Sequence, residues 1–390
     1  MGRDVLRGAS PDVVRAALAD RDPLPGTGGF AGVLDTVDLV FDDADGGVGG
    51  DEELPVAGRG GRVVRDVLGR QPVFTQGDRW SLDPDRLDDP RPVDAGHVRD
   101  LDVGTDTHVW TLPDPDPDPE TDHESAAEAV RSAVLRSVRE VSADTLAVAF
   151  SGGIDSALVA SGVDAPCYVV GFPDSHDVRA AREAAAAMDR ELRVVDLSHD
   201  DLVRAVPRIV AATGRTNPMD VQIALPLYLV AERARADGFT RLAVGQGADE
   251  LFGGYAKVVD PAADPRVDAD TVRGARRETV ETLPGQLERD VRTLRAAGVE
   301  PVAPLLHDRV IRAALPLPGE LLATPDERKV ALRRAADGVV PASVVSADKK
   351  AVQYGSLVSR ELDRLARQAG YKRRMDDHVG QYVRSLIDEE

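Results

Sequence analysis

Cysteine is nearly absent from this sequence. The single Cys167 excludes an internal disulfide framework and a cysteine-rich zinc site. It stands in the apolar run 165–172, where we expect a buried, unreactive thiol. No run of about 18 apolar residues occurs, so we expect no membrane span. Residues 1–10 lack the apolar segment of a signal peptide, and a cytoplasmic protein is therefore predicted.

Lysine is also scarce, and acidic residues are in excess. Only five of the 48 basic residues are lysine, and the net charge is −20. Such a charge repels nucleic acid, so a broad DNA or RNA contact is disfavoured. Dispersed Asp with little Lys resembles the cytosolic proteins of high-salt organisms, in which salt screens the self-repulsion. The alternative is an ordinary acidic soluble protein.

The 390 residues suggest two domains. Short β-like runs separated by Gly and Asp predict a small, mainly β domain over 1–112. Alternating Pro and Asp over 113–123 forms neither helix nor central strand and predicts an acidic, Pro-rich linker. A long acidic loop within one domain is the alternative. The second domain is predicted over 124–390.

Strand-like and helix-like segments alternate from residue 125 onward. Apolar runs at 145–150, 167–172, 192–197 and 241–247 predict buried strands, and periodic segments between them predict helices. This order predicts an α/β fold with a doubly wound parallel sheet and a mostly helical part from about residue 270. We expect the helix over 200–214 to be interrupted at Pro207.

The loop SGGIDS, residues 151–156, joins one predicted strand to a helix. At that edge of an α/β sheet ligands bind. Glycines let backbone N–H groups converge, and the start of a helix adds partial positive charge, so the loop suits a phosphate. Ser151 and Ser156 add hydroxyl groups. Asp155 would repel a bare phosphate and makes sense as a ligand of a bridging Mg²⁺.

A second glycine-rich loop, GQGADELFGGY, covers 245–255 and follows another predicted strand. It carries the acidic pair Asp249 and Glu250. A chance Gly-rich turn is possible, but its place at a second strand end predicts one site shared with the first loop.

The first loop resembles the pyrophosphate loop of ATP pyrophosphatases, which activate a substrate as an adenylate. Together the two loops resemble the synthetase domain of the asparagine synthetase family, which includes β-lactam synthetases. The stretches 298–318, 328–336 and 348–356 are similar to further family motifs, the last being a late lysine-containing loop. The resemblance covers roughly 120–360 and implies the ATP pyrophosphatase type of fold.

The resemblance implies ATP and Mg²⁺ as cofactors. Asp155 and Asp249 would hold the metal, and Lys350, with Lys349 as the alternative, would neutralise charge on the α-phosphate. A solvated lysine pair is the plainer interpretation. The implied ATP- and pyrophosphate-binding residues are Ser151, Gly152, Gly153, Asp155, Ser156, Val170, Gly171, Gly245, Gln246 and Gly247.

Two positions depart from the family pattern. Many asparagine synthetases carry Glu where Gln246 stands, and an amide cannot act as a carboxylate base. His307 stands where the family usually places Asp, with Asp308 next. His307 as a catalytic base and His307 as a packing residue both stay open. These departures put the acyl substrate in doubt more than the adenylation step.

The segment 65–74 is similar to a strand and turn of the family's glutaminase domain, yet residue 2 is Gly where that domain uses a nucleophilic Cys. We interpret 1–112 as a degenerate glutaminase-like domain without a mechanism for glutamine hydrolysis. Free ammonia, or ammonia from a partner protein, is then the expected nitrogen donor, and aspartate or a similar small carboxylate the substrate. The alternatives are amidation or lactam closure of another carboxylate and a non-catalytic nucleotide-binding relative.

Overall fold

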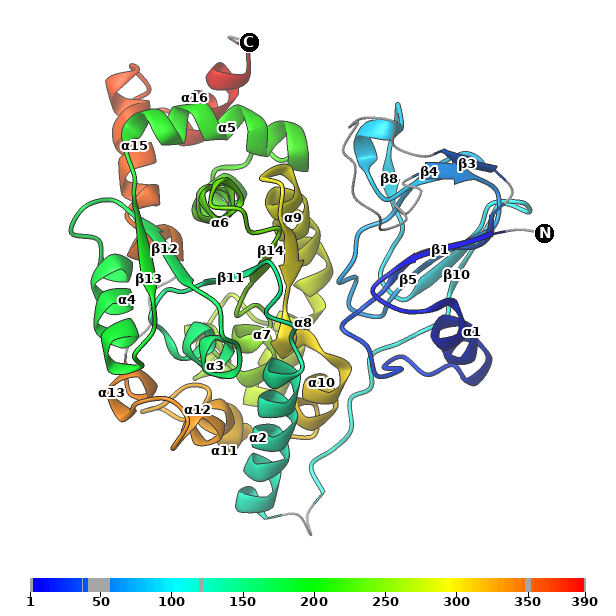
Figure 1. Ribbon diagram of the computed structural model, residues 1–390, viewed down its shortest axis with the longest axis horizontal. Helices are drawn as coiled ribbons and strands as arrows, with labels where there is room; N and C mark the ends of the chain where they lie inside the picture. Colours follow the sequence, from blue (N-terminus) through cyan, green and yellow to red (C-terminus); the bar gives the residue numbers. More distant parts are fainter. Residues whose placement is uncertain (1–2, 37, 41–56, 119–121, 348–351, 389–390) are drawn as a thin grey trace.

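A computed structural model describes residues 3–36, 38–40, 57–118, 122–347 and 352–388. Its N-terminal unit holds two five-stranded antiparallel sheets (Figure 1). The first sheet has the order β1 (Arg3–Arg7), β2 (Ala31–Thr36), β5 (Arg62–Arg65), β9 (His97–Asp100), β10 (Thr105–His108). The second has the order β3 (Asp38–Val40), β4 (Ala57–Arg59), β7 (Arg79–Ser81), β6 (Phe74–Gln76), β8 (Arg91–Pro92). The described part of this unit is mainly β, as expected.

One helix accompanies these sheets. Helix α1 (Pro11–Asp20) begins after Ser10, whose side chain accepts a hydrogen bond from the Val13 N–H, with Pro11 in the first turn. A core cluster that includes Val5, Val33 and Trp80 joins residues of both sheets. The two sheets therefore contribute side chains to a common buried cluster.

The second unit is built on a five-stranded parallel sheet. Its order is β13 (Leu192–Asp196), β12 (Cys167–Gly171), β11 (Leu146–Ala149), β14 (Arg241–Ala243), β15 (Glu300–Val302). The chain runs outward from β11 to β13 and returns to β14 on the other side of β11. All four strand pairs are parallel, with Leu146 opposite Arg241, for example. This doubly wound sheet confirms the predicted fold class.

Successive residues of these strands point to opposite faces of the sheet. Val148 and Val169 belong to one hydrophobic core, and Ala147, Tyr168 and Val170 to another. Because both faces are covered, the strands are apolar on both sides, which explains the continuous apolar runs in the sequence.

Helices cover both faces of the parallel sheet (Figure 1). The helices between the strands are α2 (His123–Arg139), α3 (Ile154–Gly162), α4 (His176–Ala187), α5 (His199–Thr213), α6 (Pro218–Ala236), α7 (Ala248–Phe252), α8 (Val272–Glu281) and α9 (Leu283–Ala296). Those after β15 are α10 (Asp308–Ala314), α11 (Gly319–Leu322), α12 (Val330–Ala336), α13 (Ala342–Val345), α14 (Val352–Gly355), α15 (Val358–Gln368) and α16 (His378–Asp388). Short 3₁₀ turns are η1 (Pro84–Arg86), η2 (Ala256–Val258), η3 (Pro261–Ala263) and η4 (Pro304–Leu306).

One expectation about elements is wrong. Helix α5 continues through Pro207, because Val206, Ile209 and Val210 are buried and tertiary packing outweighs the missing backbone hydrogen bond. The part after residue 270 is mostly helical, as expected, and also contains one short strand, β15, which pairs with β14.

The two units share one hydrophobic core. Leu24 and Leu68 of the N-terminal unit lie in the same buried cluster as Leu305 and Leu306 of the second unit. The last strand of the N-terminal sheets ends at His108 and α2 begins at His123. The domain boundaries at 112 and 124 stay a prediction.

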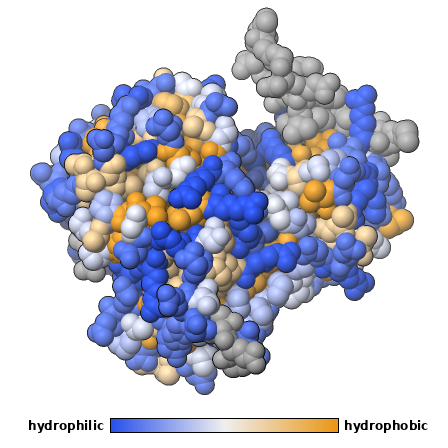
Figure 2. All heavy atoms as spheres, turned by 60° about the horizontal axis from the view of Figure 1, so that its bottom comes forward, coloured by the Kyte–Doolittle hydropathy of each residue, from blue (hydrophilic) through white to orange (hydrophobic). Residues whose placement is uncertain are grey.

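Hydrophilic residues dominate the face shown in Figure 2, and hydrophobic ones form small groups between them. Within the described ranges, each helix is either too short or too polar for a bilayer-spanning segment.

Candidate active site

The two glycine-rich loops meet where the strand order of the parallel sheet reverses. Residues 151–153 follow β11 and lead into α3, and residues 244–247 follow β14 and lead into α7. Because β11 and β14 are hydrogen-bonded neighbours, their carboxyl ends place both loops at one edge of the sheet. This edge is where open α/β sheets bind ligands.

Close packing requires glycine at two points of these loops. Gly152 has φ +76°, and a Cβ there would lie 2.4 Å from the backbone carbonyl of Ala180. A Cβ on Gly245 would lie 2.9 Å from the Cβ of Asp155. The end of β14 therefore lies directly against the first turn of α3, which carries Asp155 and Ser156.

Lys329 links the two predicted acidic residues. Its Nζ lies 2.7 Å from Oδ1 of Asp155 and 2.6 Å from Oδ1 of Asp249. The lysine is 3% exposed, and Asp155 is also buried. Asp155 and Asp249 therefore lie close together, as expected, and the ammonium group of Lys329 lies between their carboxylates.

Lys329 has an unusual backbone conformation. Its φ of +60° and ψ of +39° are left-handed, and it stands directly before α12. A non-glycine residue in this region costs on the order of 1 kcal/mol or more and persists only where the surroundings hold it. Here the packing is tight, because a Cβ on Gly254 would lie 1.9 Å from Oδ1 of Asp249 and 2.4 Å from Cε of Lys329.

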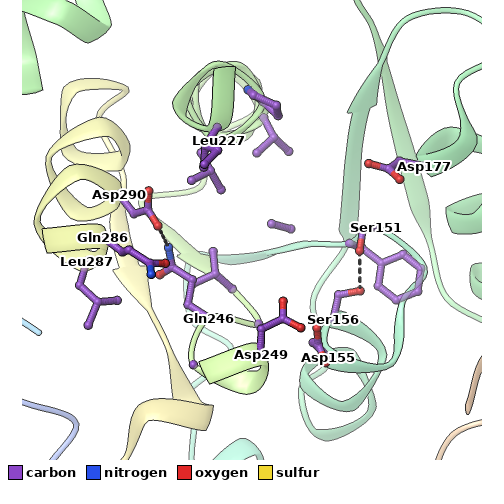
Figure 3. A pocket seen from close by; sticks show the side chains of 18 of the residues that line it. Ser151, Asp155, Ser156, Asp177, Leu227, Gln246, Asp249, Gln286, Leu287 and Asp290 are labelled. Atoms are coloured by element: carbon purple, nitrogen blue, oxygen red, sulfur yellow. Dashed lines mark hydrogen bonds between the residues drawn. The ribbon is translucent and has the colours of Figure 1, made fainter. Parts of the chain in front are cut away.

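A cavity of about 310 Å³ opens beside these side chains. Figure 3 shows Asp155, Ser151 and Ser156 on one side of it and Gln246, Gln286 and Asp290 on the other. Its apolar wall comes from α6 and from strand ends: Ile223, Pro226, Leu227, Val230, Val170 and Val244. The cavity therefore combines a polar floor with an apolar wall.

Eight residues of the predicted site line this cavity: Ser151, Asp155, Ser156, Val170, Gly245, Gln246, Gly247 and Asp249. Gly152 and Gly153 of the first loop and Gly171 at the end of β12 are not among its lining residues. Lys349 and Lys350 fall outside the residues that the structure describes, and their role stays a prediction.

A buried polar network holds Gln246. Its side-chain amide donates to Oδ2 of Asp290, while Oδ1 of Asp290 accepts from Nε of Arg289 at 2.7 Å. Arg289 also donates to Asp220 at 2.7 Å. Burial raises the pKa of the Asp290 carboxyl, with Arg289 opposing that shift. The amide at position 246 is thus a hydrogen-bond donor matched to a buried carboxylate.

Several cavity residues escaped sequence reasoning. Tyr255 donates its hydroxyl to Oε1 of Glu250 at 2.6 Å, and both residues line the cavity. Asp177, in the first turn of α4, lines it on the side of Ser151 (Figure 3). Asp177 could have been predicted from its position, because it stands in the first turn of a helix that follows a buried strand, as Asp155 does.

His307 does not line this cavity. It stands before α10, and its Nδ1 accepts a hydrogen bond from the Arg309 N–H at 3.2 Å. Burial and then the nearby Arg309 lower the pKa of His307. The packing interpretation of His307 therefore agrees with the structure better than a catalytic base does.

Cys167 is fully buried in β12, and burial raises the pKa of its thiol. It belongs to the parallel sheet, away from the N-terminal unit.

The residues at the loop edge are compatible with magnesium. In the described ranges, no three His, Cys, Asp or Glu side chains group together as a ready-made metal site. Asp155 and Asp249 nevertheless bring two carboxylates to one cation, the Lys329 ammonium. Proteins commonly hold Mg²⁺ with one or two carboxylates plus substrate phosphates, so this pair fits a metal ion that arrives with a nucleotide.

Comparison with curated proteins gives relatives of one kind. The chain is 28% identical over 298 residues to a Methanocaldococcus jannaschii protein with the provisional name of a glutamine-hydrolysing asparagine synthetase. That match covers 67% of this chain and 54% of the relative, so the chain spans about half of its length. It is 30% identical to asparagine synthetase 1 of Bacillus subtilis over 43% of this chain and 29% of that protein.

Among solved structures, an NMN synthetase from Francisella tularensis matches 69% of this chain and 94% of that chain, with 12% identity and a TM-score of 0.30. An ammonia-dependent NAD synthetase from Campylobacter jejuni covers 69% and 95%, with 12% identity and a TM-score of 0.27. Such scores do not establish a common fold.

The family model described as asparagine synthase matches residues 127–278 and 262–388, which is more than half of the chain. The chain belongs to the asparagine synthase family.

Proposed function

We propose that this chain forms an amide bond at the expense of ATP, through an acyl-adenylate, with release of AMP and pyrophosphate. Aspartate is the proposed carboxylate and ammonia the proposed nitrogen donor. The observation that carries this proposal is the contact of Asp155 and Asp249 with Lys329 at the edge of the parallel sheet. Family membership supports the same activity.

The cavity lining supports the proposed binding of ATP. The apolar wall formed by Val170, Pro226 and Leu227 suits an adenine ring. Backbone N–H groups at the start of α3, with the hydroxyls of Ser151 and Ser156, suit the β- and γ-phosphates. This arrangement would direct the α-phosphate toward the cavity between the two loops.

Charge neutralisation is the main catalytic contribution that we assign to the chain. A carboxylate oxygen attacks the α-phosphorus, the bond between the α- and β-phosphates breaks, and pyrophosphate leaves with the electron pair. We assign to the Lys329 ammonium, which bonds to Asp155 and Asp249, the donation of hydrogen bonds to phosphate oxygens as this charge develops. Magnesium, held by Asp155 and Asp249, would supply further positive charge to the same oxygens.

In the second step the nitrogen of ammonia attacks the acyl carbon, AMP leaves, and the nitrogen loses a proton. The buried Cys167 is unsuited to releasing ammonia from glutamine, so we assign free ammonia or a partner protein as its source. Purified chain should then produce no glutamate from glutamine. Glutamate release at a rate that matches ATP use would contradict this assignment.

A second candidate keeps the adenylation and changes the acyl substrate. The hydrogen-bonded pair of Gln246 and Asp290 favours this candidate, because both side chains line the cavity. Many asparagine synthetases carry Glu where Gln246 stands. Amidation or lactam closure of another carboxylate would use the same two loops. The acyl substrate is therefore to be identified by experiment.

The test is ATP–pyrophosphate exchange with a panel of carboxylates that includes aspartate. Exchange should depend on one carboxylate and fall at least 100-fold in Asp155→Ala. Asp164→Ala, at an exposed loop position, is the matched control and should stay within twofold of the unmodified chain. Absence of exchange with every carboxylate, or full exchange in Asp155→Ala, would refute the proposal.

A further inference from the structure

A buried arginine joins the N-terminal unit to the segment that precedes α10. The Nε of Arg70 donates to Oδ1 of Asp66 at 2.8 Å. Its Nη1 donates to Oδ1 of Asp308 at 2.7 Å and to the carbonyl of Leu306 at 2.8 Å. Arg70 is 3% exposed, and Asp66 and Asp308 are fully buried. Buried charges of this kind are stable only while every partner stays in place.

The N-terminal unit holds Asp308 from a second side as well. The backbone N–H groups of Gly26 and Thr27 donate to its Oδ2 at 2.9 and 2.7 Å. The N–H of Asp308 in turn donates to the carbonyl of Thr27 at 2.9 Å. The segment 306–308 is thus fixed by backbone and side-chain contacts from the N-terminal unit.

The other side of this segment supports the second glycine-rich loop. Gly247 has φ +89°, and a Cβ there would lie 2.4 Å from Cδ2 of Leu306. Leu306 is 1% exposed. Gly247 immediately precedes α7, which carries Asp249. A movement of Leu306 would therefore be transmitted to the residues that form the site.

We propose that the N-terminal unit is a positioning element of the active site, acting from Arg70 through Leu306 on the loop 245–250. Arg70 and Leu306 touch neither the cavity nor its expected ligands, so they are positioning residues. This role is compatible with a unit that has no mechanism for glutamine hydrolysis. Only the activity readout below rests on the proposed function.

Hydrogen exchange of the full chain, without ligands, tests the proposal directly. In Leu306→Ala the backbone amides of 245–254 should exchange at least tenfold faster relative to those of α5, which serve as an internal reference. Arg70→Gln should show the same acceleration of exchange. Leu306→Met keeps a side chain of similar size and should therefore show little of this acceleration.

Arg312→Ala is the matched control. Arg312 belongs to the same contact between units and bonds to Asp22 at 3.1 Å, but it lies at the exposed rim. This variant should leave the exchange of 245–254 unchanged. If Arg70→Gln does not fold, Arg70→Lys, which keeps the charge but loses the fork of donors, takes its place. Unchanged exchange of 245–254 in folded Leu306→Ala would overturn the proposal.

The second readout is ATP–pyrophosphate exchange. Leu306→Ala should lower its kcat at least tenfold and raise the Mg²⁺ concentration for half-maximal rate, whereas Arg312→Ala should change neither. An unmodified chain that exchanges no pyrophosphate would refute the proposed function and leave the hydrogen-exchange test intact. A catalytically normal Leu306→Ala would overturn the positioning role.

Discussion

The side-chain amide of Gln246 donates to the buried carboxylate of Asp290, and this pair forms one wall of the cavity (Figure 3). A glutamate at position 246 would place two carboxylates at hydrogen-bonding distance. The amide of Gln246 therefore suits this position better than a second carboxylate while Asp290 is present.

We predict that Gln246→Glu lowers the free energy of unfolding by roughly 3 kcal/mol, because it adds a second negative charge beside the buried carboxylate of Asp290. The double variant Gln246→Glu with Asp290→Asn should recover most of this loss, since the amide and the acid exchange places. Denaturant unfolding of the two single variants and the double variant measures the coupling. Additive effects would contradict it.

Lys329→Met should destabilise the chain by about 3 kcal/mol in the absence of divalent cations, because Asp155 and Asp249 then lose the ammonium group that bonds to both of them. Added Mg²⁺ should raise the Tm of this variant more than that of the unmodified chain, since binding to the folded state stabilises it. Lys372→Met, at an exposed position, is the control. An equal Mg²⁺ response in all three proteins would contradict the prediction.

Gly254→Ala should abolish most of the activity by steric displacement. Its new Cβ would overlap with Oδ1 of Asp249 and crowd Cε of Lys329. We expect the rate of ATP–pyrophosphate exchange to fall at least 100-fold. Gly285→Ala is the matched change, because the nearest atom to its Cβ lies 3.9 Å away, and it should keep full activity. An active Gly254→Ala would show that the loop tolerates displacement.

Stability should decrease on acidification in a window set by His307. Burial lowers its pKa in the folded state, below the value of about 6.5 in the unfolded chain. The unfolded state therefore binds more protons between these two values, and the free energy of unfolding rises with pH up to about 6.5. His307→Asn keeps an acceptor at the start of α10 and should remove this contribution. Unfolding of both proteins from pH 5 to 8 gives the difference, and parallel curves would contradict it.

The net charge of −20 predicts stabilisation by salt. The Tm should rise by several degrees between low and molar KCl. Sucrose at equal osmolality separates charge screening from general exclusion of cosolute from the surface. A Tm that responds equally to both, or to neither, would leave an ordinary acidic protein as the better description.

Sequence reasoning located the parts of the site that follow directly from strand ends. Asp155 and Asp249 each come a few residues after a buried strand, and neighbouring parallel strands end at one edge. The same logic pointed to Ser151, Ser156 and Gln246, and all three line the cavity. The glycines of the first loop were interpreted as phosphate-binding, and the structure shows that Gly152 and Gly245 also pack closely against Ala180 and Asp155.

The residues that escaped prediction reach the site through tertiary packing. Lys329 is 174 residues from Asp155 in the chain, and its left-handed backbone leaves no local signature. In the sequence, Lys329 was noted only within the family-like stretch 328–336 and was given no role of its own, although the chain has only five lysines. Asp290 lies in a charged stretch of α9, and such stretches are typical of a solvent-exposed helix face. It is buried because α9 packs against α6 and the loop after β14.

The sole thiol of the chain lies in the central region of the parallel sheet, shielded from reagents. Any cysteine introduced at an exposed position would consequently be the only one that reacts with a maleimide probe in the native protein. A pair of spin labels or fluorophores could therefore be attached to two introduced cysteines without replacing Cys167. One label on β10 and one beside α7 would report distance changes between them during turnover.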